Sequence, residues 1–214
     1  MLRLLVATRN QGKANEFSAM LGGQFAVSHL ADTLDLPPVD ETDDTFAGNA
    51  ALKALAVSRA LPDELVVADD SGLEVAAIGG APGVRSARYA GDNATDADNV
   101  AKLLTELVRV PEGERSARFC CVLVLAREGR TLASFCGTVE GSIARAAKGA
   151  HGFGYDPVFI PTGQTHTFAE MGNDAKSRIS HRAVAVRQLR TYIETEYLLT
   201  SDPATVRRPP AAQS

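Results

Sequence analysis

The sequence has few cysteines and no long apolar run, and each absence excludes a class of protein. Three cysteines occur in 214 residues, and two of them, Cys120 and Cys121, are adjacent. This number excludes a disulfide framework and a zinc-ligand cluster, and cysteines within strands of a cytoplasmic protein are the simpler interpretation. No apolar run approaches the roughly 20 residues that span a bilayer. The apolar run at the N-terminus is too short for a signal peptide, so we expect a cytoplasmic chain with no membrane partner.

The chain also lacks the excess of positive charge that is typical of nucleic-acid-binding proteins. Its formal net charge is −4 at pH 7, so no bulk attraction to nucleic acid is expected. A polyanionic ligand would have to be held by local lysines and arginines or by a metal. Hydrophobic residues make up 45% and charged residues 22% of the chain, a balance typical of a globular protein that buries a core of its own.

The apolar pattern predicts an α/β chain with a mixed sheet. Residues 2–8, 64–72 and 157–161 have the composition of short strands, and the second of these is expected to run into a turn. Two apolar runs flank Glu128 and Gly129, which predicts a hairpin and argues against a wholly parallel sheet. Helical spacing and stop signals predict helices over residues 14–21, 45–61, 95–110 and 180–199, with a long glycine-rich loop over 77–94.

The C-terminal segment differs from the rest of the chain in composition. Residues 199–214 are rich in proline and alanine and have almost nothing to bury, so a disordered tail is expected there. No internal repeat is visible in the sequence. Residues 1–198 are therefore expected to form a single α/β domain.

Thr8, Asn10 and Lys13 form a polar cluster between the first expected strand and the first expected helix. Gly12 and the short side chains leave backbone N–H groups free at a helix N-terminus, which favours an anion, and Lys13 adds a full charge. The G-x-x-x-x-G-K-[ST] spacing of a Walker A loop is absent. On local grounds alone, a plain helix start capped by Asn10 is the favoured interpretation.

A second cluster combines Glu41 with the helix that follows it. Asn49 and Lys53 are four residues apart, so they share one helical face that could present an amide and an ammonium to phosphate oxygens. Solvated polar positions on a helix are the alternative, and for this cluster alone they are favoured.

A third cluster is the sequence Asp69-Asp70-Ser71-Gly72, which follows the apolar residues of the second strand. Adjacent carboxylates repel, so a Mg²⁺ ion or a cationic partner would relieve them. Mg²⁺ needs only one or two protein carboxylates when substrate phosphates supply further oxygens. Asp-Ser-Gly is also good turn chemistry, but the doublet after a strand favours metal binding by Asp69 and Asp70.

The stretch "GFGYDP", residues 152–157, crowds two glycines, two aromatic rings, an acid and a proline together. A turn does not need Phe153 and Tyr155, and a core does not need the glycines. A pocket that clasps a flat ligand needs both, because glycine lets the backbone approach the ligand and the rings cover it.

Lys176, His181 and Arg182 are strong hydrogen-bond donors close to an expected helix start, for which Ser180 is a plausible N-cap. The alternative is that His181 and Arg182 only decorate an exposed helix. Taken together, the clusters supply acids, basic groups that could face phosphates and an aromatic clasp. These are the parts of a Mg²⁺-nucleotide site without a P-loop.

Six motifs carry a family resemblance. The segments "TRNQGKANEF", "ETDDTFAGNAALKA", "ADDSGLEV", "GGAPGVRSARYAG", "GFGYDPVF" and "KSRISHRAVA" occur in this order. They resemble the non-canonical purine NTP pyrophosphatases, the Ham1 or inosine triphosphate pyrophosphatase family, over about residues 1–195. The resemblance implies an elongated mixed sheet with helices in two lobes around a central cleft. It also implies Mg²⁺-dependent hydrolysis of ITP, dITP and XTP to the monophosphate and pyrophosphate, by a homodimer that clears deaminated purines from the nucleotide pool.

The resemblance also implies a role for each matching position. Phosphate contacts are implied for Thr8, Arg9, Asn10, Gln11, Gly12, Lys13, Asn49 and Lys53. Glu41 and Asp70 would serve the metal, and Asp70 would also accept a proton from the attacking water. Ser71 would touch the substrate; Phe153, Gly154, Tyr155 and Asp156 would contact the nucleoside; and Lys176, His181 and Arg182 would bind the base side. Whether Asp69 or Asp70 takes the proton is left open.

Selectivity follows from the donors at the base side. Hypoxanthine and xanthine carry an oxygen at C6, where adenine carries an amino group, and Lys176, His181 or Arg182 can donate to the oxygen only. Exclusion of guanine does not follow from this argument. Two alternatives stay open: an enzyme of similar fold that acts on pyrimidine or modified nucleotides, and a nucleotide-binding module without turnover. The Ser-His-Arg stretch weighs against the first, and Asp70 with Lys13 against the second.

Overall fold

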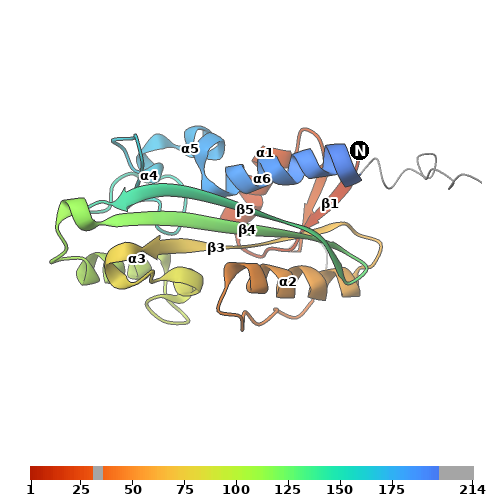
Figure 1. Ribbon diagram of the computed structural model, residues 1–214, viewed down its shortest axis with the longest axis horizontal. Coiled ribbons are helices and arrows are strands. Elements are labelled where there is room, and N and C mark those ends of the chain that lie inside the picture. The colour runs from red at the N-terminus through yellow and green to blue at the C-terminus, as the bar shows by residue number, and fades with distance from the viewer. Residues whose placement is uncertain (31–35, 198–214) are drawn as a thin grey trace, which may run out of the picture.

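A mixed six-stranded sheet is the central element of the protein, whose computed structural model describes residues 1–30 and 36–197 (Figure 1). The strand order is β2-β1-β3-β4-β5-β6. β1 pairs in parallel with β2 and β3, whereas the pairs β3–β4, β4–β5 and β5–β6 are antiparallel. The predicted α/β chain with a mixed sheet is therefore confirmed. The strands are β1 Arg3–Val6, β2 Ala26–His29, β3 Val66–Val75, β4 Ser116–Arg127, β5 Arg130–Ile143 and β6 Phe159–Pro161.

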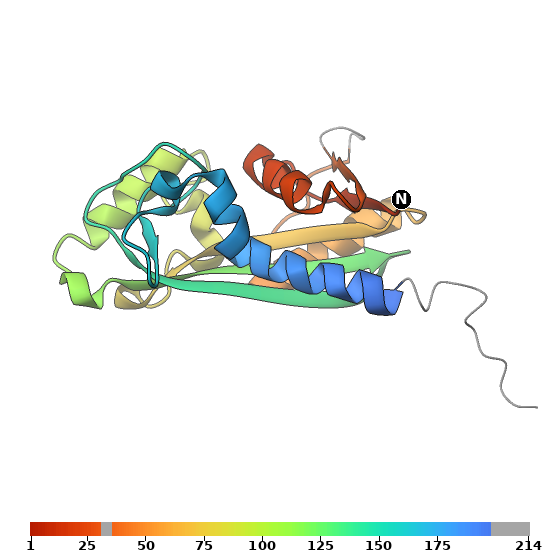
Figure 2. The same ribbon diagram turned by 90° about the horizontal axis from the view of Figure 1, so that it is seen from above.

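Helices cover both faces of the sheet. α1 and α6 pack on one face and α2 on the other, and α6 runs along the long hairpin in both views (Figures 1 and 2). α3 lies toward the end of the β4–β5 hairpin that is opposite its turn, where a separate apolar cluster forms. The α-helices are α1 Gln11–Leu21, α2 Phe46–Ala60, α3 Asp96–Glu106, α4 Phe168–Met171, α5 Asn173–Ile179 and α6 His181–Tyr192. The short 3₁₀ helices are η2 Ala76–Ile78, η3 Gly83–Arg88 and η4 Glu112–Glu114, and the π-helix η5 spans Ile193–Tyr197.

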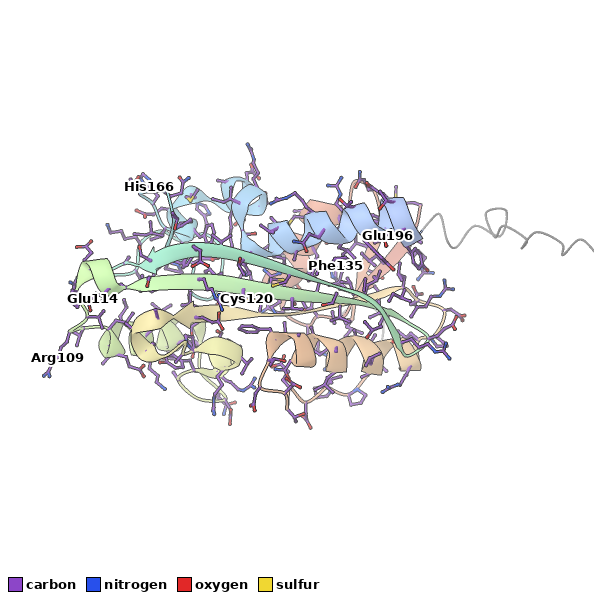
Figure 3. All side chains as sticks on the ribbon, viewed as in Figure 1. Arg109, Glu114, Cys120, Phe135, His166 and Glu196 are labelled. Atoms are coloured by element: carbon purple, nitrogen blue, oxygen red, sulfur yellow. The ribbon has the colours of Figure 1, made fainter. Side chains whose placement is uncertain are left out.

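The side chains of β3 alternate between the two faces, as a strand requires. Val67 belongs to the core under α1 and α6, whereas Val66 and Ala68 belong to the core under α2. β4 alternates in the same way, with Cys120 in the core under α2 and Cys121 in the core under α1 and α6. In the neighbouring strand β5, Phe135 belongs to the core under α6 (Figure 3). The alternation continues past the apolar residues of β3, so the adjacent acids Asp69 and Asp70 are also directed to opposite faces.

The predicted hairpin is confirmed, and its turn has the expected chemistry. β4 and β5 pair along their whole length around Glu128 and Gly129. These residues have φ angles of 53° and 70°, the left-handed conformation that a two-residue type I′ hairpin turn needs at both positions.

The prediction of a turn at Asp69–Gly72 was wrong. β3 continues to Val75 because it pairs with β4 over that whole segment, and ladder hydrogen bonds outweigh the local turn preference of Asp-Ser-Gly. The predicted loop over 77–94 contains η3 and part of η2, and β2, α4 and α5 had not been predicted. The last α-helix ends at Tyr192, where η5 follows it.

Gly137 allows the N-terminus of α6 to sit directly on β5. A Cβ atom at Gly137 would lie 2.2 Å from the backbone oxygen of His181 and 2.6 Å from the backbone nitrogen of Ala185. Any larger side chain would therefore push α6 away from the sheet. This close approach places the first residues of α6 next to the middle of the sheet.

The segment 199–214, predicted as a disordered tail, lies outside the described residues, and a single domain over residues 1–198 stays a prediction. Among the described residues, no helix combines the length and the apolar character needed to cross a membrane.

Candidate active site

The connection from β1 to α1 is built as a capped helix start. The Asn10 side chain accepts a hydrogen bond from the backbone nitrogen of Lys13 at 2.9 Å, which confirms Asn10 as the N-cap. Thr8 accepts from the backbone nitrogen of Asn10 at 3.2 Å. With this cap, α1 begins at Gln11, earlier than predicted, so Lys13 lies in its first turn.

Asp69 is directed to the α1 and α6 side of β3, where two cations surround it. Its Oδ1 atom lies 3.0 Å from the Lys13 ammonium, and its Oδ2 atom accepts from Arg182 Nη2 at 2.8 Å and from Ser71 at 3.1 Å. Burial raises the pKa of Asp69, but the charges of Lys13 and Arg182 outweigh burial and hold that pKa well below its usual range. Asp69 is therefore a fully ionised carboxylate with both oxygens engaged.

Asp70 is directed to the α2 side, and only one of its two carboxylate oxygens has a hydrogen-bond partner among the described residues. Its Oδ1 atom lies 3.0 Å from the Lys53 ammonium, whereas its Oδ2 atom is buried and has no hydrogen-bond partner among the described residues. Burial raises the pKa of Asp70 more than the nearby Lys53 charge lowers it. A buried carboxylate oxygen without a partner costs free energy, so a site that keeps one calls for an explanation.

Glu41 lies beside Asp70 and shares its lysine. Oε1 of Glu41 is 2.9 Å from the Lys53 ammonium, and Oε2 accepts from Arg88 Nη1 at 3.0 Å. Burial raises the pKa of Glu41, but the pairing with Lys53 and Arg88 lowers it by more, so the pKa lies below its usual value. Two acids and two cations thus alternate on this side of β3.

These acids fit a Mg²⁺ ion that takes the rest of its ligands from phosphates. Asp70 offers an unpartnered oxygen and Glu41 is its neighbour, which matches the one or two carboxylates that Mg²⁺ uses at such sites. Asp69 does not fit, because its carboxylate is directed to the opposite face of β3, where it pairs with Lys13 and Arg182. In the part of the chain that the structure describes, no group of three or more His, Cys, Asp or Glu could cage a metal alone.

At the other end of the site, Lys176 and Arg182 are buried and share Glu16. The Lys176 ammonium lies 2.7 Å from Glu16 and 2.5 Å from Asp156, and Arg182 Nη1 donates to the other oxygen of Glu16. Arg182 and Lys176 are therefore already paired with acids. Ser180 caps α6 as predicted, since its side chain accepts from the backbone nitrogen of Ala183.

His181 differs from its two basic neighbours because its ring makes no hydrogen bond within residues 1–30 and 36–197. Its Nδ1 atom is buried without a partner, and the ring stacks on Phe119 with centroids 4.6 Å apart and an interplanar angle of 10°. Burial lowers the pKa of His181 well below its usual value, and the charges of Arg182 and Lys176 lower it further. His181 is therefore a neutral ring that can both donate and accept a hydrogen bond.

The two aromatic residues of the "GFGYDP" stretch have different environments. Tyr155 is buried in the core, and its hydroxyl donates to the backbone oxygen of Ser86 at 2.9 Å. Phe153 is half-buried, with the Lys176 ammonium 4.5 Å from its ring centroid. A Cβ atom on Gly12 would lie 2.6 Å from the Phe153 ring, so the glycine allows this ring to reach the start of α1.

Two adjoining pockets bring most of these residues together. The first, of about 110 Å³, is lined by the acids Glu41 and Asp70 and by the base-side residues. The second, of about 260 Å³, continues from it past Asn10, Lys13 and Glu41. Predicted residues that line the first are Asn10, Lys13, Glu41, Asp70, Ser71, Phe153, Gly154, Tyr155, Asp156, Lys176, His181 and Arg182. Thr8, Arg9, Lys53 and Asp69 line the second.

Three predicted residues do not line either pocket. Asn49 is fully buried, and its amide bonds with the backbone of Asp43, so it shapes the loop before α2 and does not face a ligand. Gln11 is exposed and bonds with Asn15. Gly12 packs against Phe153, as described above.

Sequence reasoning missed several residues of this site. Glu16 and Arg88 lie inside quoted motifs, but nothing in their local sequence shows that they pair with Lys176, Arg182 or Glu41. Asp96 lines the first pocket and accepts from the backbone nitrogen of Gly154 at 2.6 Å. Contacts of this kind join segments far apart in the chain, so a local pattern does not reveal them.

The chain is similar in sequence to proteins of one family. A family model described as the Ham1 family matches residues 4–192. A protein of Geobacillus kaustophilus, named dITP/XTP pyrophosphatase, is 50% identical over 190 residues, which cover 88% of this chain and 93% of the relative. A Bacillus subtilis protein of the same name is 42% identical over 195 residues, covering 91% and 98% of the two chains.

Solved structures show the same similarity. The structure of the Staphylococcus aureus Ham1 protein has a TM-score of 0.80 and 40% identity, covering 91% of this chain and 99% of that one. The crystal structure of a nucleoside-triphosphatase, or dITP/XTP pyrophosphatase, from Mycobacterium abscessus has a TM-score of 0.70 and 39% identity, covering 88% and 98%. The match to the family model, over residues 4–192, includes residues of all six strands and the segments that line both pockets.

Proposed function

The chain belongs to the Ham1 family, and from this premise we propose that it is a Mg²⁺-dependent hydrolase of the non-canonical purine triphosphates ITP, dITP and XTP. The products are the nucleoside monophosphate and pyrophosphate. The observation that carries the proposal is the convergence of Lys13, Asp70 and His181 on one pocket. The names of the relatives support the substrate class.

The acid end of the pocket suits cleavage of a phosphoanhydride. When bound by Asp70 and Glu41, Mg²⁺ would neutralise charge on the phosphate oxygens and make water easier to deprotonate. Lys13 and Lys53 hold the phosphates, so that the α-phosphorus faces the attacking water. Burial raises the pKa of Asp70, so of the two aspartates it is the better acceptor for the proton of that water. Asp69 is a poor acceptor, since Lys13 and Arg182 hold it ionised and engaged.

The base end of the pocket suits an oxopurine. The neutral His181 ring can donate a hydrogen bond to the oxygen at C6, while Lys176 and Arg182 stay paired with their acids. Adenine presents an amino donor at that position, which leaves the His181 donor without an acceptor. Sites built around such a bond reject the wrong partner by up to about 10⁴-fold. Phe153 covers the face of the base, a contact of about 1–3 kcal/mol.

Product analysis on ITP with and without Mg²⁺ tests the reaction. We expect pyrophosphate and IMP with the metal and no turnover after chelation. Release of orthophosphate would contradict cleavage between the α- and β-phosphates. ITP bound tightly without any product would favour a binding module.

A panel of ITP, XTP, GTP, ATP, dTTP and UTP tests the substrate class. We expect the highest kcat/KM for ITP and XTP, and a preference for UTP would overturn the assignment. The homodimer that the resemblance implies stays a prediction, which size-exclusion chromatography with light scattering would check. The cytoplasmic location expected from the sequence also stays a prediction, and cell fractionation would check it.

A further inference from the structure

Lys53 occupies the position between the two acids that fit a metal. Its ammonium lies 2.9 Å from Glu41 Oε1 and 3.0 Å from Asp70 Oδ1. The lysine comes from α2 and the acids from the preceding loop and from β3, so three separate segments meet at one nitrogen. The site is mostly buried, with the Lys53 side chain 14% exposed and that of Asp70 7% exposed. Solvent therefore screens these charges weakly.

The other oxygens of the two acids are not equivalent. Arg88 takes the second oxygen of Glu41, whereas the second oxygen of Asp70 is buried without a partner in the described part of the chain. A divalent cation could contact Asp70 through that oxygen. It could contact Glu41 only by competing with Lys53 or Arg88 for an oxygen that already accepts a charged hydrogen bond.

We propose that Lys53 is a resident counter-ion that competes with the divalent metal for Glu41 and Asp70, and that it is released toward the phosphates when metal and nucleotide arrive together. This proposal rests on the proposed function for its second half only. The triphosphate supplies the negative charge that Lys53 gains in exchange, and Lys53 lines the pocket that continues from the acids past Lys13. The acids alone therefore bind metal weakly, and the metal enters with the nucleotide.

The first test measures metal binding without any nucleotide. Mn²⁺ is titrated into the full-length protein, and free Mn²⁺ is counted by electron paramagnetic resonance. We expect Lys53→Met to bind Mn²⁺ about 10-fold more tightly than the wild type, the scale of one charge-assisted hydrogen bond removed from competition. Because no nucleotide is present, this result does not depend on whether the protein hydrolyses ITP.

Lys13→Met is the matched control. Lys13 carries the same charge and lines the same pockets, but its ammonium pairs with Asp69 on the other face of β3, 3.0 Å from Oδ1. Removing it changes the field at the acids without freeing a contact on Glu41 or Asp70. We expect the Mn²⁺ affinity of Lys13→Met to stay within about 3-fold of the wild type, since a change of that size corresponds to less than one hydrogen bond. An equal gain in both variants would show a general charge effect and overturn the proposal.

The second test measures turnover of ITP, which is expected to change in the opposite direction from metal affinity. Lys53→Met is expected to lower kcat/KM for ITP while it tightens metal binding, whereas loss of a merely structural residue would weaken both. If Lys53→Met does not fold, Lys53→Gln carries the same expectation, because its amide keeps a donor but no charge. Unchanged Mn²⁺ affinity in a folded Lys53 variant overturns the proposal. Wild-type binding of Mn²⁺ on the order of 1 μM or tighter without nucleotide overturns it independently of either variant.

Discussion

Asp69 and Asp70 are adjacent in the sequence, yet they belong to two different ionic networks on opposite faces of β3. The Asp69 network alternates three cations with three acids and leaves no oxygen of Asp69 free; its members are Lys13, Asp69, Arg182, Glu16, Lys176 and Asp156. The Asp70 network is shorter and ends in an unpartnered oxygen; its members are Arg88, Glu41, Lys53 and Asp70.

The difference between the two networks separates stability from chemistry. A carboxylate that is saturated by fixed cations is a strong structural link but a weak base, because proton uptake would break its ion pairs. A carboxylate with one free oxygen in a buried position is costly to the fold but available to a ligand or a proton. The strand alternation places one acid of each kind at the same point of the sheet.

The largest expected effect is on turnover when the reactive acid is neutralised. Asp70→Asn should lower kcat for ITP by about 10³-fold or more, because it removes the proton acceptor and a metal contact together. Its thermal unfolding should change little, since burial already disfavours the charged form of Asp70. Pyrophosphate release and differential scanning calorimetry measure the two effects, with the exposed Asp92→Asn as control. Full activity of Asp70→Asn would refute the role.

The next effect is on stability when the saturated acid is neutralised. Asp69→Asn leaves the fully buried Arg182 with one acid fewer and Lys13 without its partner. Breaking a buried pair in this way costs about 3–5 kcal/mol of unfolding free energy. Denaturant titration of both Asn variants gives the comparison directly. A loss in Asp70→Asn as large as that in Asp69→Asn would show that the two networks are not distinct.

The pH dependence of stability should also distinguish the two acids. Lys13 and Arg182 hold the pKa of Asp69 well below its usual range, so the unfolded chain takes up a proton near pH 3.9 at a point where the native chain does not. The unfolded state then binds more protons, so the unfolding free energy falls as the pH falls below about 4. Chemical denaturation at several acidic pH values should show a weaker decline for Asp69→Asn. An identical decline in wild type and variant would exclude Asp69 as its source.

The smallest expected effect is at the exposed end of the Asp70 network. The pair of Arg88 and Glu41 has side chains 30% and 27% exposed, so solvent weakens it and Arg88→Gln should cost about 1 kcal/mol or less. Arg182→Gln, at the buried centre of the other network, should cost several times more. Equal unfolding free energies for the two variants would contradict the assignment of the Asp69 network as the structural one.

Several parts of the site were predictable because their signals are local. Asn10 and Ser180 were recognised as helix caps since a cap needs only a short polar side chain before a helix. The turn at Glu128 and Gly129 was recognised in the same way. Asn49 and Tyr155 were harder, because a polar or aromatic residue near a site can serve either the ligand or the core, and only their actual partners, Asp43 and Ser86, distinguish the two uses.

The sequence by itself determined the α/β class, the hairpin, the helix caps and the family, because periodicity, capping and ordered motifs are properties of short segments. Only the tertiary structure decided which acid is free and which is saturated. The two aspartates have the same chemistry and adjacent positions, and what distinguishes them is the set of charges that distant segments bring to each face of β3. Glu16 and Arg182, 166 positions apart in the chain, meet there, and a contact over that separation depends on the packing of α1 and α6 on the sheet.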